Sequence, residues 1–268
     1  AARMFFSRKG TKVNLVAGFP WFGRWGRDTF ISLPGLCIAL DDWRMFRLAI
    51  DTMLEDFKDG FFPNIGEGTQ AAYNSIDAPL WFFWALQQYA YINDARKEVW
   101  QAYNGVMRSI LENFSEGTSN VRMDSNFLLW QGEDGKALTW MDAIVNGQPV
   151  TQRKGYAVEI NALWYNAVMF YRELAKLQCQ DGEIAKWDEF AANFPTNFKA
   201  TFWSKELGYL ADYVDGSYKD FSVRCNMIFA SSLEYSPISP KIRQLIVEKV
   251  KGELLTPRGL RTLSPTHP

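Results

Sequence analysis

Imidazole and thiol groups are scarce in this chain of 268 residues, which contains one histidine and three cysteines. His267 lies next to the end of the sequence, and this position argues against imidazole metal sites and against Ser-His or Cys-His catalysis. Cys37, Cys179 and Cys225 lack metal-ligand spacing and lie in apolar stretches, as reduced core thiols do. Acid-base chemistry is therefore expected to use carboxyl groups, and we predict no metal or organic cofactor.

The sequence also lacks a strong excess of positive or negative charge, and it lacks long apolar runs. Lys and Arg number 29 against 30 Asp and Glu, so no positive field concentrates nucleic acids or anionic membranes. The longest apolar stretches, such as 78–85, fall short of the about 20 residues of a membrane-spanning helix. We therefore predict neither a nucleic acid nor a membrane partner. Reduced thiols and the lack of a visible signal peptide favour a cytoplasmic protein, and nothing indicates the oligomeric state.

Aromatic residues, by contrast, are abundant, with 11 Trp, 11 Tyr and 20 Phe making up 16% of the chain. Large rings bury much apolar area, so one interpretation is a core rich in rings. The other is a cleft in which flat rings stack on the apolar faces of sugars. Composition alone does not separate the two.

No linker or low-complexity run divides the sequence, which predicts a single domain over residues 1–268. Apolar residues at helical spacing predict eight helices. Their approximate ranges are 29–40, 43–58, 76–92, 95–114, 156–177, 183–203, 222–234 and 240–250. Between residues 121 and 150 this spacing is lost, which indicates a short β or loop insertion. Helical hairpins without intervening strands give an all-α fold, and without a fixed repeat a closed toroid is preferred over a bundle or solenoid.

Polar and aromatic residues gather in two segments near predicted helix starts. The segment 18–28 ends in Arg27 and Asp28. Asp28 could cap the following helix, or the pair could offer sugar hydroxyls a hydrogen-bond donor beside an acceptor. The second segment, residues 60–81, contains Asn64 and Asp77. Asp77 lies near a predicted helix start, where a carboxylate interacts favourably with the helix dipole.

A third segment contains Asp142, which lies between Met141 and Ala143 and directly after Trp140. Apolar neighbours disfavour the charged form of a carboxyl group. A carboxylic acid that keeps its proton near neutrality is what a general acid for glycosidic cleavage must be. The alternative is a structural carboxylate bonded to backbone N–H groups.

Five motifs in this order resemble those of the glycogen debranching enzyme family, and more closely its amylo-α-1,6-glucosidase catalytic domain. They are residues 21–33 (WFGRWGRDTFISL), 62–64 (FPN), 73–81 (YNSIDAPLW), 139–143 (TWMDA) and 158–164 (VEINALW). The resemblance extends over residues 18–265. It implies an (α/α)6 toroid, incomplete in this sequence, that removes single α-1,6-linked glucosyl stubs from glycogen or a branched α-glucan oligosaccharide with inversion.

The resemblance also implies roles for individual residues. Asp142 matches the general acid of the family, and Arg27 with Asp28 matches the pair that holds the non-reducing glucose. Further polar positions of the pocket correspond to Asn64, Asp77, Arg153, Glu159 and Asn161. The rings that become candidates for the substrate funnel are Trp21, Trp25, Trp81, Trp140 and Trp164.

Two departures from the family pattern are visible. Residues 151–153 read TQR where the family usually has Thr-Pro-Arg, so Gln152 is expected to leave Arg153 less firmly placed. Inversion requires a second carboxyl group as general base, and the resemblance places it beyond residue 265. We therefore expect residues 1–268 alone to turn over little substrate, with Glu159 or Asp77 as the alternative bases.

Two other functions fit the same observations. A toroid that binds carbohydrate without catalysis would hold oligosaccharides whether or not Asp142 is present. A glucoamylase-like or trehalase-like enzyme would instead prefer maltose or trehalose to a limit dextrin. The sequence leaves open the branch length that is accepted and the presence of a transferase domain.

Overall fold

The computed structural model describes residues 1–18 and 21–267, which form two compact units. Unit 1 comprises Ala1–Asn113 and Leu138–Trp140, and unit 2 comprises Phe114–Ala137 and Met141–Pro268. Helices predominate in both units, so the predicted helical character is confirmed.

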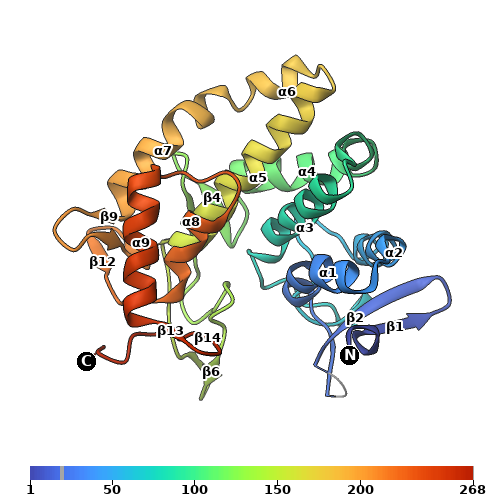
Figure 1. Cartoon of the computed structure of the whole chain (residues 1–268), viewed down its shortest axis with the longest axis horizontal. Helices are drawn as coiled ribbons and strands as arrows, with labels where there is room; N and C mark the ends of the chain where they lie inside the picture. The colour runs from blue at the N-terminus through green and yellow to red at the C-terminus, as the bar shows by residue number, and fades with distance from the viewer. Residues whose placement is uncertain (19–20, 268) are drawn as a thin grey trace. The chain divides into compact units, whose positions relative to one another are not determined.

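Unit 1 consists of a small sheet followed by helices (Figure 1). Its strands are β1 (Phe6–Lys9), β2 (Lys12–Gly18) and β3 (Phe22–Arg24), which pair antiparallel in the order β1-β2-β3. Its helices are η1 (Ala2–Phe5), α1 (Gly26–Leu40), α2 (Trp43–Leu54), η2 (Gly68–Gln70), α3 (Ala78–Ile92) and most of α4 (Arg96–Glu116). Strand β2 packs against α2, and α1 packs against α3.

A cluster of three phenyl rings holds α1 and α3 together. Phe30 of α1 lies 4.8 Å from Phe62 and 5.5 Å from Phe82 of α3, measured between ring centroids, and all three side chains are fully buried. Rings of this size remove large apolar areas from water, and their edge-to-face geometry is favourable. These aromatic residues therefore belong to the core, as the first interpretation of the composition proposed.

Unit 2 combines three longer helices with several short hairpins. Its helices are α5 (Val158–Leu177), α6 (Asp181–Ala185), α7 (Asp188–Phe202), η3 (Cys225–Ile228), α8 (Phe229–Ser232) and α9 (Pro240–Glu253). The strands near its beginning are β4 (Val121–Met123), β5 (Leu129–Gln131), β6 (Ile144–Val145), β7 (Gln148–Pro149) and β8 (Tyr156–Ala157). Later strands are β9 (Trp203–Ser204), β10 (Tyr209–Leu210), β11 (Tyr213–Asp215), β12 (Tyr218–Asp220), β13 (Leu255–Thr256) and β14 (Gly259–Leu260). Strands β12, β11 and β8 of unit 2 form a three-stranded sheet in that order.

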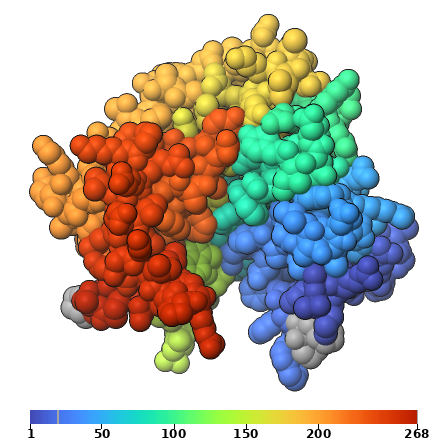
Figure 2. Space-filling view, in the orientation of Figure 1, coloured from blue at the N-terminus to red at the C-terminus, as the bar shows by residue number. Residues whose placement is uncertain are grey.

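Residues at helical spacing build the core of unit 2. Phenylalanines recur every fourth residue along α7, at positions 190, 194, 198 and 202, and all are buried. Helix α9 buries one stripe, Ile242, Ile246 and Val250, while Figure 2 shows the helix at the surface of the unit. Both helices therefore form because one face can be removed from water.

Several predicted helix boundaries are confirmed by local chemistry. The Asp42 side chain accepts a hydrogen bond from the Met45 N–H at 3.2 Å and caps α2. Pro240 begins α9, where its missing N–H costs nothing. Gly117 follows α4 with a φ of 100°, a conformation that favours glycine.

Three helix predictions are corrected. Helix α2 ends at Leu54, not near residue 58. The helix predicted over 183–203 is divided into α6 and α7, although Pro195 is accommodated inside α7. Only the short η3 and α8 form in the segment 222–234.

Several short strands were not predicted from the sequence, among them β9 to β12 between residues 203 and 220. Strands of two or three residues are too short to produce a recognisable alternation of apolar and polar side chains. The predicted insertion at 121–150 is confirmed as the hairpins β4-β5 and β6-β7. In the described part of the chain, no helix is both long enough and apolar enough to cross a lipid bilayer.

Candidate active site

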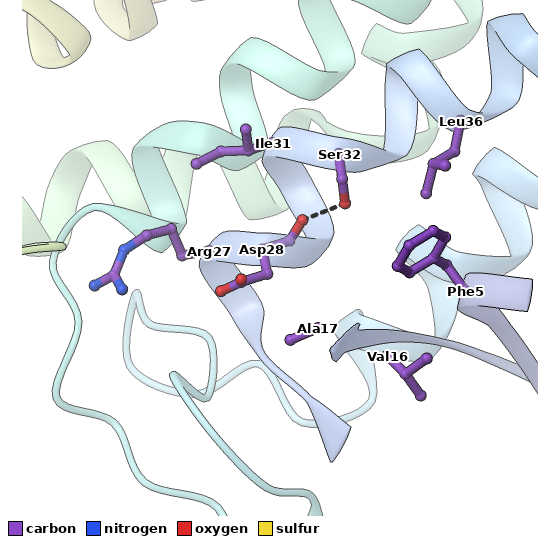
Figure 3. A pocket seen from close by; sticks show the side chains of 8 residues that line it. All are labelled: Phe5, Val16, Ala17, Arg27, Asp28, Ile31, Ser32 and Leu36. Atoms are coloured by element: carbon purple, nitrogen blue, oxygen red, sulfur yellow. Dashed lines mark hydrogen bonds between the residues drawn. The ribbon is translucent and has the colours of Figure 1, made fainter. Parts of the chain in front are cut away.

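A pocket of about 260 Å³ lies in unit 1 where β2 meets the beginning of α1 (Figure 3). It is lined by Phe5, Val16, Ala17, Arg27, Asp28, Ile31, Ser32 and Leu36. Most of these side chains are apolar, and Asp28 presents an exposed carboxylate. A pocket with apolar walls and a few polar groups is the usual form of a small-molecule site.

Arg27 and Asp28 do not form the adjacent donor and acceptor that the sequence suggested. Consecutive residues on a helix point about 100° apart, and Figure 3 shows the Arg27 guanidinium extending away from the Asp28 carboxylate. Asp28 is also not the N-cap of α1, because Trp25 occupies that position.

The Arg27 guanidinium is held by the second polar segment of the sequence. Arg27 Nε donates to Asp77 Oδ2 at 2.7 Å, and the side chain of Asp77 is 1% exposed. Ser75 Oγ donates to the other oxygen of Asp77. Asp77 occupies the N-cap position of α3, but its side chain makes no capping hydrogen bond. Asp77 is therefore a buried carboxylate with a bond to each oxygen, which argues against a role as general base.

Asn64 lies beside the start of α1 and is buried. Its carbonyl oxygen accepts from the Gly26 N–H at 3.0 Å. A Cβ atom at position 26 would lie 2.3 Å from the Pro63 carbonyl oxygen, so this close approach requires glycine. Asn64 Oδ1 has no hydrogen-bond partner among the described residues, so the predicted role of Asn64 as a polar pocket residue stays open.

The predicted funnel tryptophans lie in very different environments. Trp21 is 84% exposed, whereas Trp81 is 7% exposed and Trp25 and Trp140 are half-buried. Trp164 has no exposed surface and packs edge-on against Trp187 and Phe190, at centroid distances of 5.8 Å. The prediction that Trp164 contacts a sugar is therefore wrong, because no face of its ring is open.

Asn161 also requires a correction. Its Oδ1 accepts from the Leu129 N–H at 2.7 Å, and its Nδ2 donates to the carbonyl oxygens of Leu129 at 3.1 Å and Ala157 at 3.0 Å. The side chain is fully buried and ties β5 to the start of α5. It stabilises backbone and offers no group to a substrate.

Asp142 lies in unit 2, in an irregular segment two residues before β6, and is half-buried. The preceding residue, Met141, accepts a contact from Asn226 Nδ2 to its Sδ at 3.4 Å. Asp142 is thus neither fully buried nor fully exposed, and its neighbour in the chain is held by a buried amide.

Arg153 and Glu159 belong to a buried ion-pair cluster in unit 2. Arg153 Nη2 donates to Glu159 Oε2 at 2.7 Å, and Nη1 donates to Oε1. Arg153 Nε lies 2.8 Å from Asp212 Oδ2, and Arg224 Nε lies 3.7 Å from the same oxygen. The side chains of Arg153, Glu159 and Asp212 are at most 2% exposed. They support the site and do not touch solvent, which corrects the prediction that Arg153 and Glu159 bind substrate directly.

The cluster is electrically balanced, with two guanidinium groups and two carboxylates. Burial acts to lower the pKa of Arg153, but the charges of Asp212 and Glu159 outweigh burial and raise it. Burial raises the pKa of Asp212 to about 6, against the opposing charge of Arg153. The two groups thus stabilise each other's charged form against the effect of burial. Gln152 has not left Arg153 loose, because this cluster fixes it.

Asp212, Arg224 and Asn226 were not singled out in the sequence. A usable signal was present for Asp212, which interrupts the otherwise apolar run Leu210–Val214. A lone carboxylate in such a run must be paired when it is buried. Its partners are far away in the sequence, so only the folded chain identifies them.

No group of three or more His, Cys, Asp and Glu side chains within residues 1–18 and 21–267 is arranged to hold a metal ion. The chemistry of these sites is that of carboxyl, guanidinium and amide groups.

Comparison with known proteins identifies the family of this chain. The glycogen debranching enzyme of Saccharomyces cerevisiae is 24% identical over 342 residues, which cover 94% of this chain and 22% of that enzyme. The chain thus spans about a fifth of the length of this relative. A GH78 family rhamnosidase of Bacillus sp. GL1 has a similar fold, with a TM-score of 0.55 and 13% identity over 88% of this chain and 23% of that one. The sequence profile of the amylo-alpha-1,6-glucosidase family matches residues 1–268 in full, and the chain therefore belongs to this family.

Proposed function

We propose that the intact protein that contains this domain hydrolyses α-1,6-glucosidic branch stubs in glycogen or a limit dextrin and releases glucose with inversion. The family match over residues 1–268 supports a debranching glycosidase. The observation that carries the proposal is the environment of Asp142. Asp142 is half-buried and lies in the motif that the family model covers, while Asp77 and Glu159 are buried and held by arginines.

Asp142 acts as the general acid and donates its proton to the glycosidic oxygen as the bond to the glucosyl stub breaks. A water molecule attacks the anomeric carbon from the opposite face, and a second carboxylate takes its proton. Glu159 and Asp77 are not that base, because their oxygens are bonded to Arg153 and to Arg27 with Ser75.

In unit 1, the pocket beside Asp28 offers a sugar the exposed Asp28 carboxylate for hydrogen bonds and an apolar wall for contact. The exposed ring of Trp21 offers a flat face on which a sugar can stack. No metal or organic cofactor takes part in this scheme.

The experiment is the substitution Asp142→Asn in the intact protein. Loss of the proton donor should lower the rate of glucose release from a phosphorylase limit dextrin by about 100- to 10,000-fold. Binding of a branched oligosaccharide, measured by calorimetry, should be retained. An unchanged rate would exclude Asp142 as the acid, and a wild-type protein that binds the dextrin but releases no glucose would instead be a carbohydrate-binding module.

A further inference from the structure

Asp212 is held at both its side chain and its backbone in the buried cluster of unit 2. It follows β10, and its Oδ1 accepts from Asn226 Nδ2 at 2.7 Å while its Oδ2 is paired with Arg153. Its backbone carbonyl accepts from the Val158 N–H and from Arg153 Nη2, both at 3.0 Å. Both ends of the residue are thus held, and the position of its carboxylate is set by β11 and the start of α5.

Asn226 connects this carboxylate to Met141, the residue that precedes Asp142. It lies in η3, has no exposed surface, and its Nδ2 contacts both Asp212 Oδ1 and Met141 Sδ. An amide NH2 group has two hydrogens, so each acceptor can receive one. The carboxylate of Asp212 orients the amide, and the amide in turn holds the thioether.

Met141 requires such an anchor. Methionine has three rotatable side-chain bonds and adapts easily to its surroundings, and the segment around it is neither helix nor strand. Adjacent Cα atoms are about 3.8 Å apart, so holding Met141 also limits where the carboxyl group of Asp142 can lie.

We propose that Asp212 is a positioning residue for the general acid Asp142, acting through Asn226 and Met141. The inference rests on the proposed function of Asp142. A catalytic group displaced by about 1 Å can lose about 100-fold in rate, so fixing one neighbour of the acid has a direct kinetic consequence. The cluster supplies this rigidity at a distance from the reacting atoms.

The experiment compares two substrates in the intact protein. A limit dextrin has a sugar leaving group that must be protonated, whereas fluoride leaves α-glucosyl fluoride without a proton donor. A variant that only misplaces the acid should therefore be impaired on the dextrin and spared on the fluoride. A variant with general structural damage should be impaired on both.

The sharpest variant is Met141→Leu, which keeps the volume and apolar character of the side chain and removes the sulfur acceptor. It should lower kcat on the dextrin about 5- to 20-fold with KM nearly unchanged, and leave kcat on the fluoride within about 3-fold. Asp212→Asn should give the same pattern with a larger loss. The matched control is Met169→Leu, because Met169 Sδ is contacted by Arg172 and lies ten residues beyond Glu159 along α5. This control should retain wild-type kinetics.

Each outcome decides a separate question. Asp142→Asn tests the proposed function: if it remains active on the dextrin, Asp142 is not the acid and the positioning role falls with it. If Asp142→Asn loses only the dextrin activity, a Met141→Leu variant with wild-type kcat, or with equal losses on both substrates, overturns the role of Asp212. Should Asp212→Asn fail to fold, Met141→Leu alone gives the answer.

Discussion

At the scale of single residues, environment separates carboxyl groups that look equivalent in the sequence. Glu159 is locked in a two-point contact with Arg153, Asp77 is bonded to Arg27 and Ser75, and Asp142 remains half-buried. A buried carboxylate that is paired with an arginine is shielded from water and held in its charged form. Burial thus distinguishes Asp142 from the two carboxylates that are enclosed in ion pairs.

Glu159→Gln should destabilise the protein by about 3–5 kcal/mol, because it leaves the buried guanidinium of Arg153 without a full counter-charge. Denaturant unfolding of the variant and the wild type would measure this difference. The matched control is Glu133→Gln, which breaks the exposed pair with Lys136 and should change the free energy of unfolding by less than about 1 kcal/mol. Equal effects of the two substitutions would contradict the structural role of the buried pair.

At the scale of elements, the loop between α2 and α3 is fixed by one carboxylate. Asp56 Oδ2 accepts from Arg24 Nη2 at 2.5 Å and Oδ1 from the Gly68 N–H at 3.1 Å. Its backbone carbonyl accepts from the Tyr73 hydroxyl at 2.7 Å. These contacts hold the loop that leads to Asp77, so the end of α2 helps to position the partner of Arg27.

Asp56 gives this loop a pH dependence. Burial acts to raise the pKa of Asp56, but the Arg24 guanidinium and the Gly68 N–H outweigh burial and hold it below its usual value. A depressed carboxyl pKa adds stability above about pH 4, and this stability is lost as the pH falls through the folded-state value. As the pH is lowered below about 4, the melting temperature of the wild type should therefore fall more than that of Asp56→Asn, as measured by calorimetry. A parallel decline in both proteins would show that Asp56 is not responsible.

At the scale of the whole molecule, the family relation predicts which substrate is preferred. Glucose release should be fastest from a phosphorylase limit dextrin and slower from maltose and from trehalose, because the proposed pocket receives a branched α-glucan. Initial rates at equal substrate concentration would measure this order. If the dextrin were the poorest substrate, a glucoamylase-like or trehalase-like activity would replace the debranching proposal.

The sequence by itself determined the helical character, the family and the identity of the candidate acid. The spacing of apolar residues predicts which face of a helix is buried, as in α7 and α9. Motifs such as residues 139–143 consist of consecutive residues. These features are local in sequence, so they can be recognised without coordinates.

Only the tertiary structure decided which polar residues face a substrate and which support the fold. Trp164 and Asn161 lie in recognised motifs, yet both are buried and used by the core. Asp212 and Asn226 lie outside those motifs, yet they hold Met141. Burial and hydrogen bonding depend on partners as many as 85 residues away, and no local pattern encodes such a contact.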